Sequence, residues 1–72
     1  MLYTGEQAHQ IVGEILESVT TDKNGNSSYP AHEGDQGYYK EGGKWVAFDN
    51  STCDCWVEEF KTRKEAISWL DN

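Results

Sequence analysis

Two cysteines separated by one residue, Cys53 and Cys55, are the first candidates for chemistry in this sequence. Two thiolates on one side of an extended chain can supply half of a tetrahedral zinc site, and His9 or His32 could add nitrogen ligands. Neither histidine stands at a zinc-motif spacing, and Cys-x-Cys is shorter than the usual gap of about two to four residues. The pair therefore favours two small apolar core side chains, with a metal or redox site as the alternative.

The Asp- and Asn-rich segment that begins at Asp22 is a second candidate metal site. Asp22, Asn24 and Asn26 match the first, third and fifth positions of a calcium-binding loop, and Glu33 matches its last position. Ser27 stands where such loops need glycine, and no helical pattern follows. We expect turns here, with a calcium site as the alternative.

The carboxylates and histidines do not form a recognisable catalytic set. Glu58 and Glu59 are neighbours on a predicted strand, so their side chains point to opposite faces and cannot act on one substrate atom. The sequence contains neither a nucleophile elbow nor a glycine-rich phosphate loop. We therefore expect no enzymatic activity and no cofactor.

A net charge of −7, from thirteen acidic and six basic residues, limits the partners. Phosphate backbones and anionic membranes attract basic patches, and the only cluster of bases is Lys61, Arg63 and Lys64. We expect neither nucleic acid nor membrane as a partner, but another protein with a basic surface. An apolar run of roughly 20 residues and a signal-peptide pattern are both missing, which gives the expectation of a cytoplasmic protein.

The size of the chain favours a single compact α+β domain that covers residues 1–72. Aromatic residues make up 12% of the sequence, and each can bury roughly 150–250 Å², which compensates for the short length. Residues 20–36 are almost all turn formers, and long loops of this kind are often functional or mobile.

Two amphipathic helices are expected, one near each end of the chain. The first covers residues 4–19, with a capping box formed by Thr4 and Gln7. Its apolar residues recur every three or four positions: Ala8, Ile11, Val12, Ile15, Leu16 and Val19. The second helix follows Thr62, which forms a capping box with Glu65.

Three strands are expected between the helices. The first two, Tyr38–Glu41 and Lys44–Phe48, are joined by Gly42-Gly43, which suits a tight hairpin turn. The third covers Cys53 to Phe60. The predicted fold class is thus α+β, a three-stranded antiparallel β-meander with two helices, in the order α-β-β-β-α, packed on one face.

The strand residues have mixed character on both faces of the sheet. Trp56 and Phe60 share one face with Glu58, whereas Val57 shares the other face with Glu59. Since neither face is cleanly polar, we expect the helix-free face to expose aromatic surface that binds a partner. The candidate partner-binding residues are Tyr39, Trp45, Trp56, Glu58 and Glu59.

A strand that ends in Phe60 and is followed by Thr-x-x-Glu-Ala at the start of a helix is similar in rhythm to two kinds of small module. These are the arm-type DNA-binding domains of phage integrases and HicB-like antitoxins. The resemblance covers less than half of the chain. Its implied DNA binding is not carried over, because the predicted sheet contains Asp54, Glu58 and Glu59 where arm-type domains are basic.

We therefore predict a small acidic, non-enzymatic protein-binding module, an accessory protein of bacterial or phage origin. A metal-binding module that uses Cys53 and Cys55, or the loop at 22–33, is one alternative. The other is a homodimeric structural protein in which the predicted edge strand Tyr38–Glu41 pairs across a two-fold axis.

Overall fold

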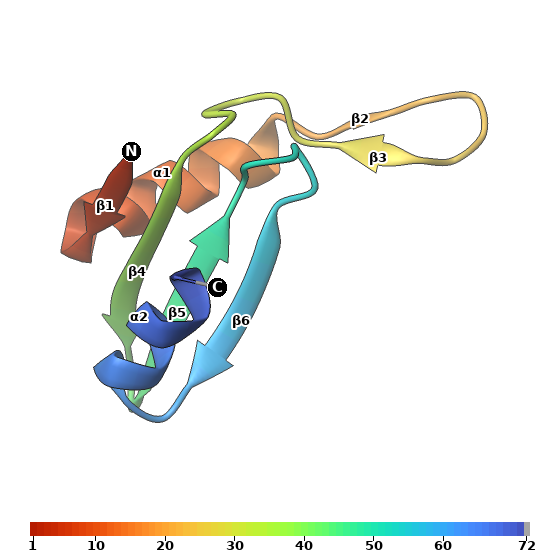
Figure 1. The fold of residues 1–72 in the computed structure, drawn as a ribbon. Coiled ribbons are helices and arrows are strands. Elements are labelled where there is room, and N and C mark those ends of the chain that lie inside the picture. Colours follow the sequence, from red (N-terminus) through yellow and green to blue (C-terminus); the bar gives the residue numbers. More distant parts are fainter. Residues whose placement is uncertain (72) are drawn as a thin grey trace.

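A mixed four-stranded sheet forms the centre of the protein in the computed structural model, which describes residues 1–71. Its strands are β1 (Leu2–Thr4), β4 (Gln36–Glu41), β5 (Lys44–Asp49) and β6 (Trp56–Phe60), in the spatial order β1-β4-β5-β6. The predicted antiparallel meander is present as β4-β5-β6. The prediction of three strands is incomplete, because β1 adds to β4 in parallel (Figure 1).

The pairing of β1 also changes the position of Tyr38–Glu41 in the sheet. Thr4 pairs with Tyr38, so the first half of β4 lies between β1 and β5. The prediction that Tyr38–Glu41 is an edge strand is therefore wrong for its first residue. The remaining residues, 39–41, have no partner on the β1 side, and the two edge strands of the sheet are β1 and β6.

The two helices, α1 (Gly5–Glu17) and α2 (Arg63–Leu70), pack on opposite faces of the sheet. Apolar residues of α1 pack with Tyr39, Val46 and Phe48, whereas those of α2 pack with Tyr38 and Ala47. The prediction that both helices share one face is wrong. The reason is the alternation of side chains along β4 and β5, which places apolar groups on both faces, and each face needs its own cover.

The ends of the helices differ in how well the sequence predicts them. The Thr62–Glu65 capping box at α2 is confirmed, with the Thr62 hydroxyl accepting a hydrogen bond from the Glu65 N–H. Thr4 is the N-cap residue of α1, as predicted, but the predicted capping box with Gln7 is wrong, because the Thr4 side chain makes no capping hydrogen bond. Thr4 is the last residue of β1, and the chain enters the helix directly through Gly5, whose φ is +62°.

The predicted apolar stripe of the first helix is buried only in part. Ala8, Ile11, Val12 and Ile15 are buried against the sheet. Leu16 and Val19 are exposed, and Val19 lies beyond the end of α1.

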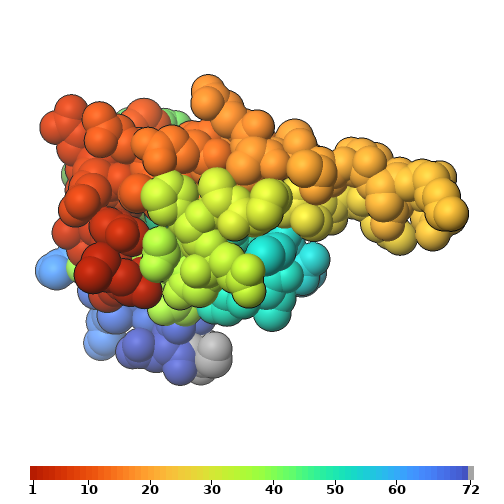
Figure 2. All heavy atoms as spheres, turned by 90° about the horizontal axis from the view of Figure 1, so that it is seen from above, coloured from red at the N-terminus to blue at the C-terminus, as the bar shows by residue number. Residues whose placement is uncertain are grey.

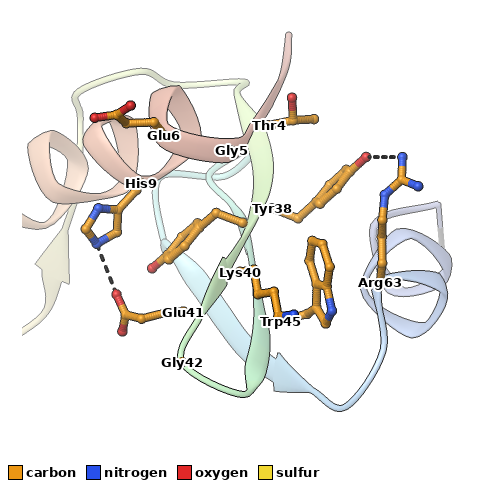
Figure 3. A pocket seen from close by; sticks show the side chains of 11 residues that line it. Thr4, Gly5, Glu6, His9, Tyr38, Lys40, Glu41, Gly42, Trp45 and Arg63 are labelled. Carbon is orange, nitrogen blue, oxygen red and sulfur yellow. Dashed lines mark hydrogen bonds and ion pairs between the residues drawn. The ribbon is translucent and has the colours of Figure 1, made fainter.

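Contacts between Arg63 and Tyr38 hold the start of α2 against the sheet (Figure 3). The guanidinium donates a hydrogen bond of 3.3 Å to the Tyr38 hydroxyl, and its carbon lies 5.7 Å from the centre of the Tyr38 ring. A cation over an aromatic face adds electrostatic attraction to the packing. This helix is therefore fixed to β4 at its first residue as well as through its apolar arc.

The structure contains two hairpins, of which the sequence predicted only one. Glu41 pairs with Lys44, so Gly42-Gly43 forms the predicted two-residue hairpin turn, and Gly42 has a φ of +62°. Within residues 20–36 lies a second, small hairpin made of β2 (Thr20–Thr21) and β3 (Ser27–Ser28). Figure 2 shows this hairpin projecting from the body, so it accounts for much of the 39 Å length.

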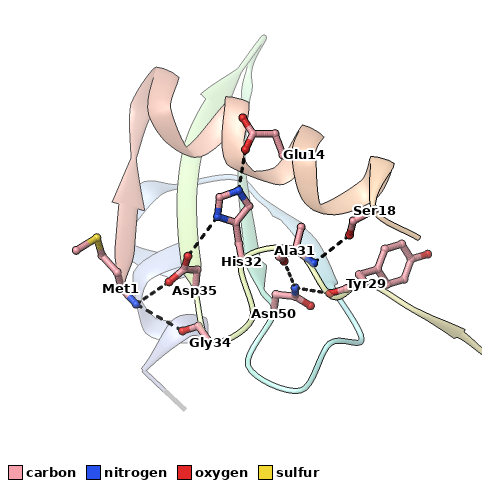
Figure 4. Close-up of polar contacts among 9 residues, drawn as sticks. All are labelled: Met1, Glu14, Ser18, Tyr29, Ala31, His32, Gly34, Asp35 and Asn50. Carbon is pink, nitrogen blue, oxygen red and sulfur yellow. Dashed lines mark hydrogen bonds and ion pairs between the residues drawn. The ribbon is translucent and has the colours of Figure 1, made fainter. Parts of the chain in front are cut away.

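Asn50 joins the loop after β3 to the loop before β6 (Figure 4). Its amide N–H₂ donates to the carbonyl oxygens of Tyr29 and Ala31, both at 2.8 Å, and its side-chain oxygen accepts from the Cys55 N–H. The side chain is fully buried, so each of these hydrogen bonds replaces one that water can no longer supply. Among described residues, no buried side-chain nitrogen or oxygen lacks a partner.

Beside Asn50, His32 connects the same loop to α1 (Figure 4). One ring nitrogen lies 2.7 Å from a Glu14 carboxylate oxygen, and the other lies 3.5 Å from Asp35. His32 also has a φ of 55°, which a non-glycine residue adopts only where its surroundings hold it. These contacts hold residues 29–35 close to the body although they lack regular structure.

Within residues 1–71, no helix has the length and apolar character needed to span a membrane.

Replacing Asn50 by alanine is expected to destabilise the fold by about 3 kcal/mol, because it leaves two carbonyl oxygens and one N–H unpaired in a buried site. Urea denaturation monitored by tryptophan fluorescence measures the change. Asn26→Ala, at an exposed position where the backbone makes the contacts, is the control and is expected to stay within about 0.5 kcal/mol of the wild type. An equal loss in both variants would contradict the role of Asn50.

Stability is expected to decrease in acid in part through Asp49. Burial alone would raise the pKa of this carboxyl, but hydrogen bonds from Ser51 and Gln36 outweigh burial and hold the pKa below its usual value. A lowered folded-state pKa contributes stability above the unfolded pKa of about 3.9, and this contribution is lost as pH falls through the folded-state pKa. Asp49→Asn should therefore melt lower than the wild type at pH 6, with the difference shrinking towards pH 3.

Melting curves between pH 3 and 6 check this expectation, with Asp54→Asn as the control for loss of one exposed carboxylate. A constant difference between Asp49→Asn and the wild type across that range would contradict it.

Candidate binding surface

The edge strand β6 is the least covered strand of the sheet. Its first four residues, Trp56 to Glu59, are exposed, and only Phe60 is partly buried in the α2 cluster. The side chains alternate, so Val57 and Glu59 lie on the α1 side and Trp56 and Glu58 on the α2 side. In Figure 1 this strand lies at the border of the sheet, with no element beyond it.

Helix α1 does not extend over β6, because it packs on β1 and β4 and on the inner part of β5. A groove of about 580 Å³ is left on that face, lined by Tyr39, Glu41, Val46, Val57, Glu58 and Glu59. The Glu58 side chain points to the other face, so the groove combines apolar groups with two carboxylates, those of Glu41 and Glu59. The groove therefore suits a ligand that has both apolar and positively charged groups.

Tyr39 contributes the phenol of this groove, although its side chain is mostly buried. Burial raises the pKa of the Tyr39 hydroxyl, and the neighbouring charges of Glu41 and Glu59 raise it further. The phenol thus stays protonated at neutral pH and remains a hydrogen-bond donor. The same carboxylates that raise this pKa give the groove its negative potential.

Of the two carboxylates of β6, one is ion-paired and the other is not. The Lys44 ammonium lies 3.4 Å from Glu59, and both side chains are well exposed. Glu58 has no ion-pair partner within residues 1–71. An exposed pair such as Lys44–Glu59 contributes little to stability, so both carboxylates remain accessible to a partner.

Trp56 is the largest exposed apolar side chain on the sheet, with 61% of its surface accessible. Val57, the next residue, is 40% exposed on the other face. A single exposed apolar residue is ordinary on a protein surface. Here two adjacent ones lie on both sides of one edge strand, next to two carboxylates, which is the composition of a binding surface that has an apolar anchor. We call Trp56, Val57, Glu58 and Glu59 the β6 surface.

A second hollow, of about 710 Å³, lies where the C-terminal half of β4 meets the starts of both helices (Figure 3). On one side of it Lys40 lies 6.0 Å from the Trp45 ring centre, and Arg63 contacts Tyr38. On the other side His9 is 3.1 Å from Glu41. The charged groups that line this hollow are thus largely engaged with neighbouring side chains, which favours a structural role for them.

Three of the five residues predicted to bind a partner come together on the β6 surface: Trp56, Glu58 and Glu59. Tyr39 lies in the floor of the adjacent groove. Trp45 lies elsewhere, packed against the α2 cluster next to Tyr38. Sequence reasoning did not select Val57, although its alternation with Trp56 along the strand was the signal that could have identified it.

Cys53 and Cys55 lie in the loop before β6, not in the strand where the sequence placed them. Both adopt positive φ, 63° and 52°, and both are free thiols. Burial raises the pKa of each thiol, and at Cys53 the neighbouring Glu33 and Asp54 raise it further. Cys55 packs against the α1 core cluster, as a small apolar side chain would.

The proposed calcium ligands are divided between two places. The Asp22 carboxylate accepts hydrogen bonds from the Asn24 and Asn26 N–H groups at 2.8 and 3.0 Å, and so closes the turn of the small hairpin. Glu33 lies instead beside Cys53. Within the part of the chain that the structure describes, no three or more His, Cys, Asp or Glu side chains are grouped to hold a metal ion.

Comparison of this chain with protein-family models, with curated proteins and with solved structures gave no significant match. By its own fold and surface, the protein is a small α+β domain with one helix on each sheet face and an open, acidic edge strand.

The two thiols are expected to react slowly with an aromatic disulfide reagent at pH 7.5, because raised pKa values keep the thiolate fraction low. The rate should increase as the pH is raised, and unfolding in urea should bring it to that of a free cysteine derivative. Absorbance of the released thiolate gives the rate. Native thiols that react as fast as the free derivative would contradict the assignment.

Proposed function

We propose that this protein is a non-enzymatic protein-binding module that docks another protein through the β6 surface. The observation that carries the proposal is the exposure of Trp56 at the edge of the sheet, directly beside two accessible carboxylates. Tryptophan is enriched among residues that dominate binding energy, because it buries a large area with few rotatable bonds.

The charge of the protein supports a basic partner. The net charge is −7, and two carboxylates, those of Glu41 and Glu59, line the groove next to β6. A basic protein surface would be attracted over a distance and would then pair with Glu58 and Glu59 at close range. Nucleic acid fits this surface poorly, because its phosphates would be repelled by the same carboxylates.

The contacts of the histidines and cysteines favour binding over catalysis. His9 is paired with Glu41, and His32 with Glu14 and Asp35, so neither ring contacts a hydroxyl or thiol nucleophile in the described contacts. The thiol pKa values are raised, which disfavours both nucleophilic attack and metal binding at neutral pH. Two free thiols also suit a reducing compartment, and we propose a cytoplasmic accessory role, in a bacterium or a phage-infected cell.

Substitutions on the β6 surface test the proposal. A partner captured by immobilised wild-type protein should be lost by Trp56→Ala, with a cost of about 2 kcal/mol or roughly thirtyfold in Kd. The double variant Glu58→Lys with Glu59→Lys should lose it as well, through charge reversal. Isothermal titration with the purified partner measures each affinity, and circular dichroism confirms that each variant is folded.

Glu6→Lys with Glu17→Lys is the matched control, since it makes the same change in net charge at two exposed positions of α1. Capture that depends equally on the α1 pair and on the β6 pair would indicate only general charge attraction. Capture that survives Trp56→Ala and both reversals would contradict the β6 surface as the site.

A further inference from the structure

In addition to its side chains, β6 presents backbone hydrogen-bonding groups to a partner. A strand at the edge of a sheet carries unpaired N–H and C=O groups along its outer side. β6 has such an edge over five residues, Trp56–Phe60, and contains no proline, whereas the other edge strand, β1, has only three residues. A further strand could therefore add to β6 with regular hydrogen bonds.

A second copy of this chain is a poor occupant of that edge. Two β6 strands that pair over their full length around a two-fold axis must run antiparallel, with Glu58 opposite Glu58 of the other copy. Like charges directly opposite each other destabilise a strand pair. Glu59 would lie diagonally across from its own equivalent and add to the repulsion. A shift of two residues avoids the central clash but leaves only three residues paired.

Protection against unwanted strand pairing does not by itself explain the residues of β6. Edge strands that are protected against pairing carry charges in place of large apolar side chains. On β6 the two carboxylates stand next to Trp56 and Val57, which remain exposed on opposite faces. An edge that repels its own copy and yet keeps apolar anchors on both faces is suited to a strand of a different sequence.

We propose that the occupant of β6 is an extended segment of a basic partner protein, which adds to the sheet as a fifth strand. This inference rests on the proposed protein-binding function and specifies its mode. Lysine or arginine of the segment lies opposite Glu58 on the α2 side and opposite Glu59 on the α1 side. Apolar residues of the segment lie against Trp56 and Val57, and the α1-side groove beside Tyr39 receives the side chains on that face.

The probe is a short peptide with blocked ends, Thr-Ile-Lys-Lys-Val-Tyr-Thr, which places the two lysines opposite the two glutamates in an antiparallel pairing. Titrated into the full chain, labelled with ¹⁵N, it should slow hydrogen exchange at outward-facing amides of Trp56–Phe60. The same peptide with both lysines replaced by glutamate should bind at least about tenfold more weakly. An analogue N-methylated on the backbone positions that face β6 should lose binding.

The outcomes of these experiments distinguish the binding mode, strand addition to β6, from the proposed function, protein binding. If the N-methylated analogue binds as well as the parent, or if the basic peptide does not bind, strand addition to β6 is overturned, while partner capture that depends on Trp56 still supports the protein-binding function. If partner capture does not depend on the β6 surface, the function itself fails.

The oligomeric state tests whether a second copy of this chain occupies the β6 edge. Sedimentation at pH 7 should find the wild type monomeric, whereas Glu58→Thr with Glu59→Thr should self-associate as concentration rises, because the repulsion is removed. A wild-type dimer with β6 amides already protected in the absence of peptide would overturn the proposal in favour of a second copy.

Discussion

The central strands β4 and β5 carry apolar side chains on both of their faces, and this constraint organises the rest of the molecule. Tyr39, Val46 and Phe48 need cover on one side, and Tyr38 and Ala47 need it on the other. A chain of this length supplies only two helices, so each face receives one. α1 covers the β1–β4 half of its face, and α2 crosses the other face. Neither helix reaches the outer side of β6, which is why that strand stays open.

Asn50 holds together the loops at one end of this sheet. The buried amide holds Tyr29 and Ala31 from one loop and Cys55 from another. Cys53 and Cys55 both adopt positive φ next to it, a conformation that costs energy for a residue with a Cβ and that persists where surrounding contacts fix it. The thiols that attracted attention in the sequence thus lie in a tightly bound turn that delivers the chain into β6.

The β6 surface follows from these two features together. The turn after Asn50 fixes where β6 begins, and the one-helix-per-face arrangement leaves it uncovered. Trp56 and Val57 then stay in contact with water on opposite sides of one strand, at a cost that a partner would remove. In the binding mode that we propose, the carboxylates beside them disfavour pairing of the open edge with a second copy and favour a basic partner.

Local patterns in the sequence determined much of this protein. The spacing of Ala8, Ile11, Val12 and Ile15 identified the buried side of α1, the Gly42-Gly43 pair identified the hairpin, and Thr62 with Glu65 identified the start of α2. The alternation along β6 also placed Trp56, Glu58 and Glu59 among the partner-binding candidates. Each of these features depends on residues within a few positions of one another.

The tertiary structure decided what local patterns leave open. The parallel pairing of β1 with β4 joins residues more than thirty positions apart, and a three-residue strand is too short to leave a periodic signal. In the sequence alone, the mixed character of the strand faces indicated one bare face. On β4 and β5 the mixed character reflects two covered faces, whereas most of β6 is exposed on both. Periodicity states which side chains share a face of a strand. Which helix meets that face, and which strand is left at the edge, depends on how much apolar surface each distant pairing buries.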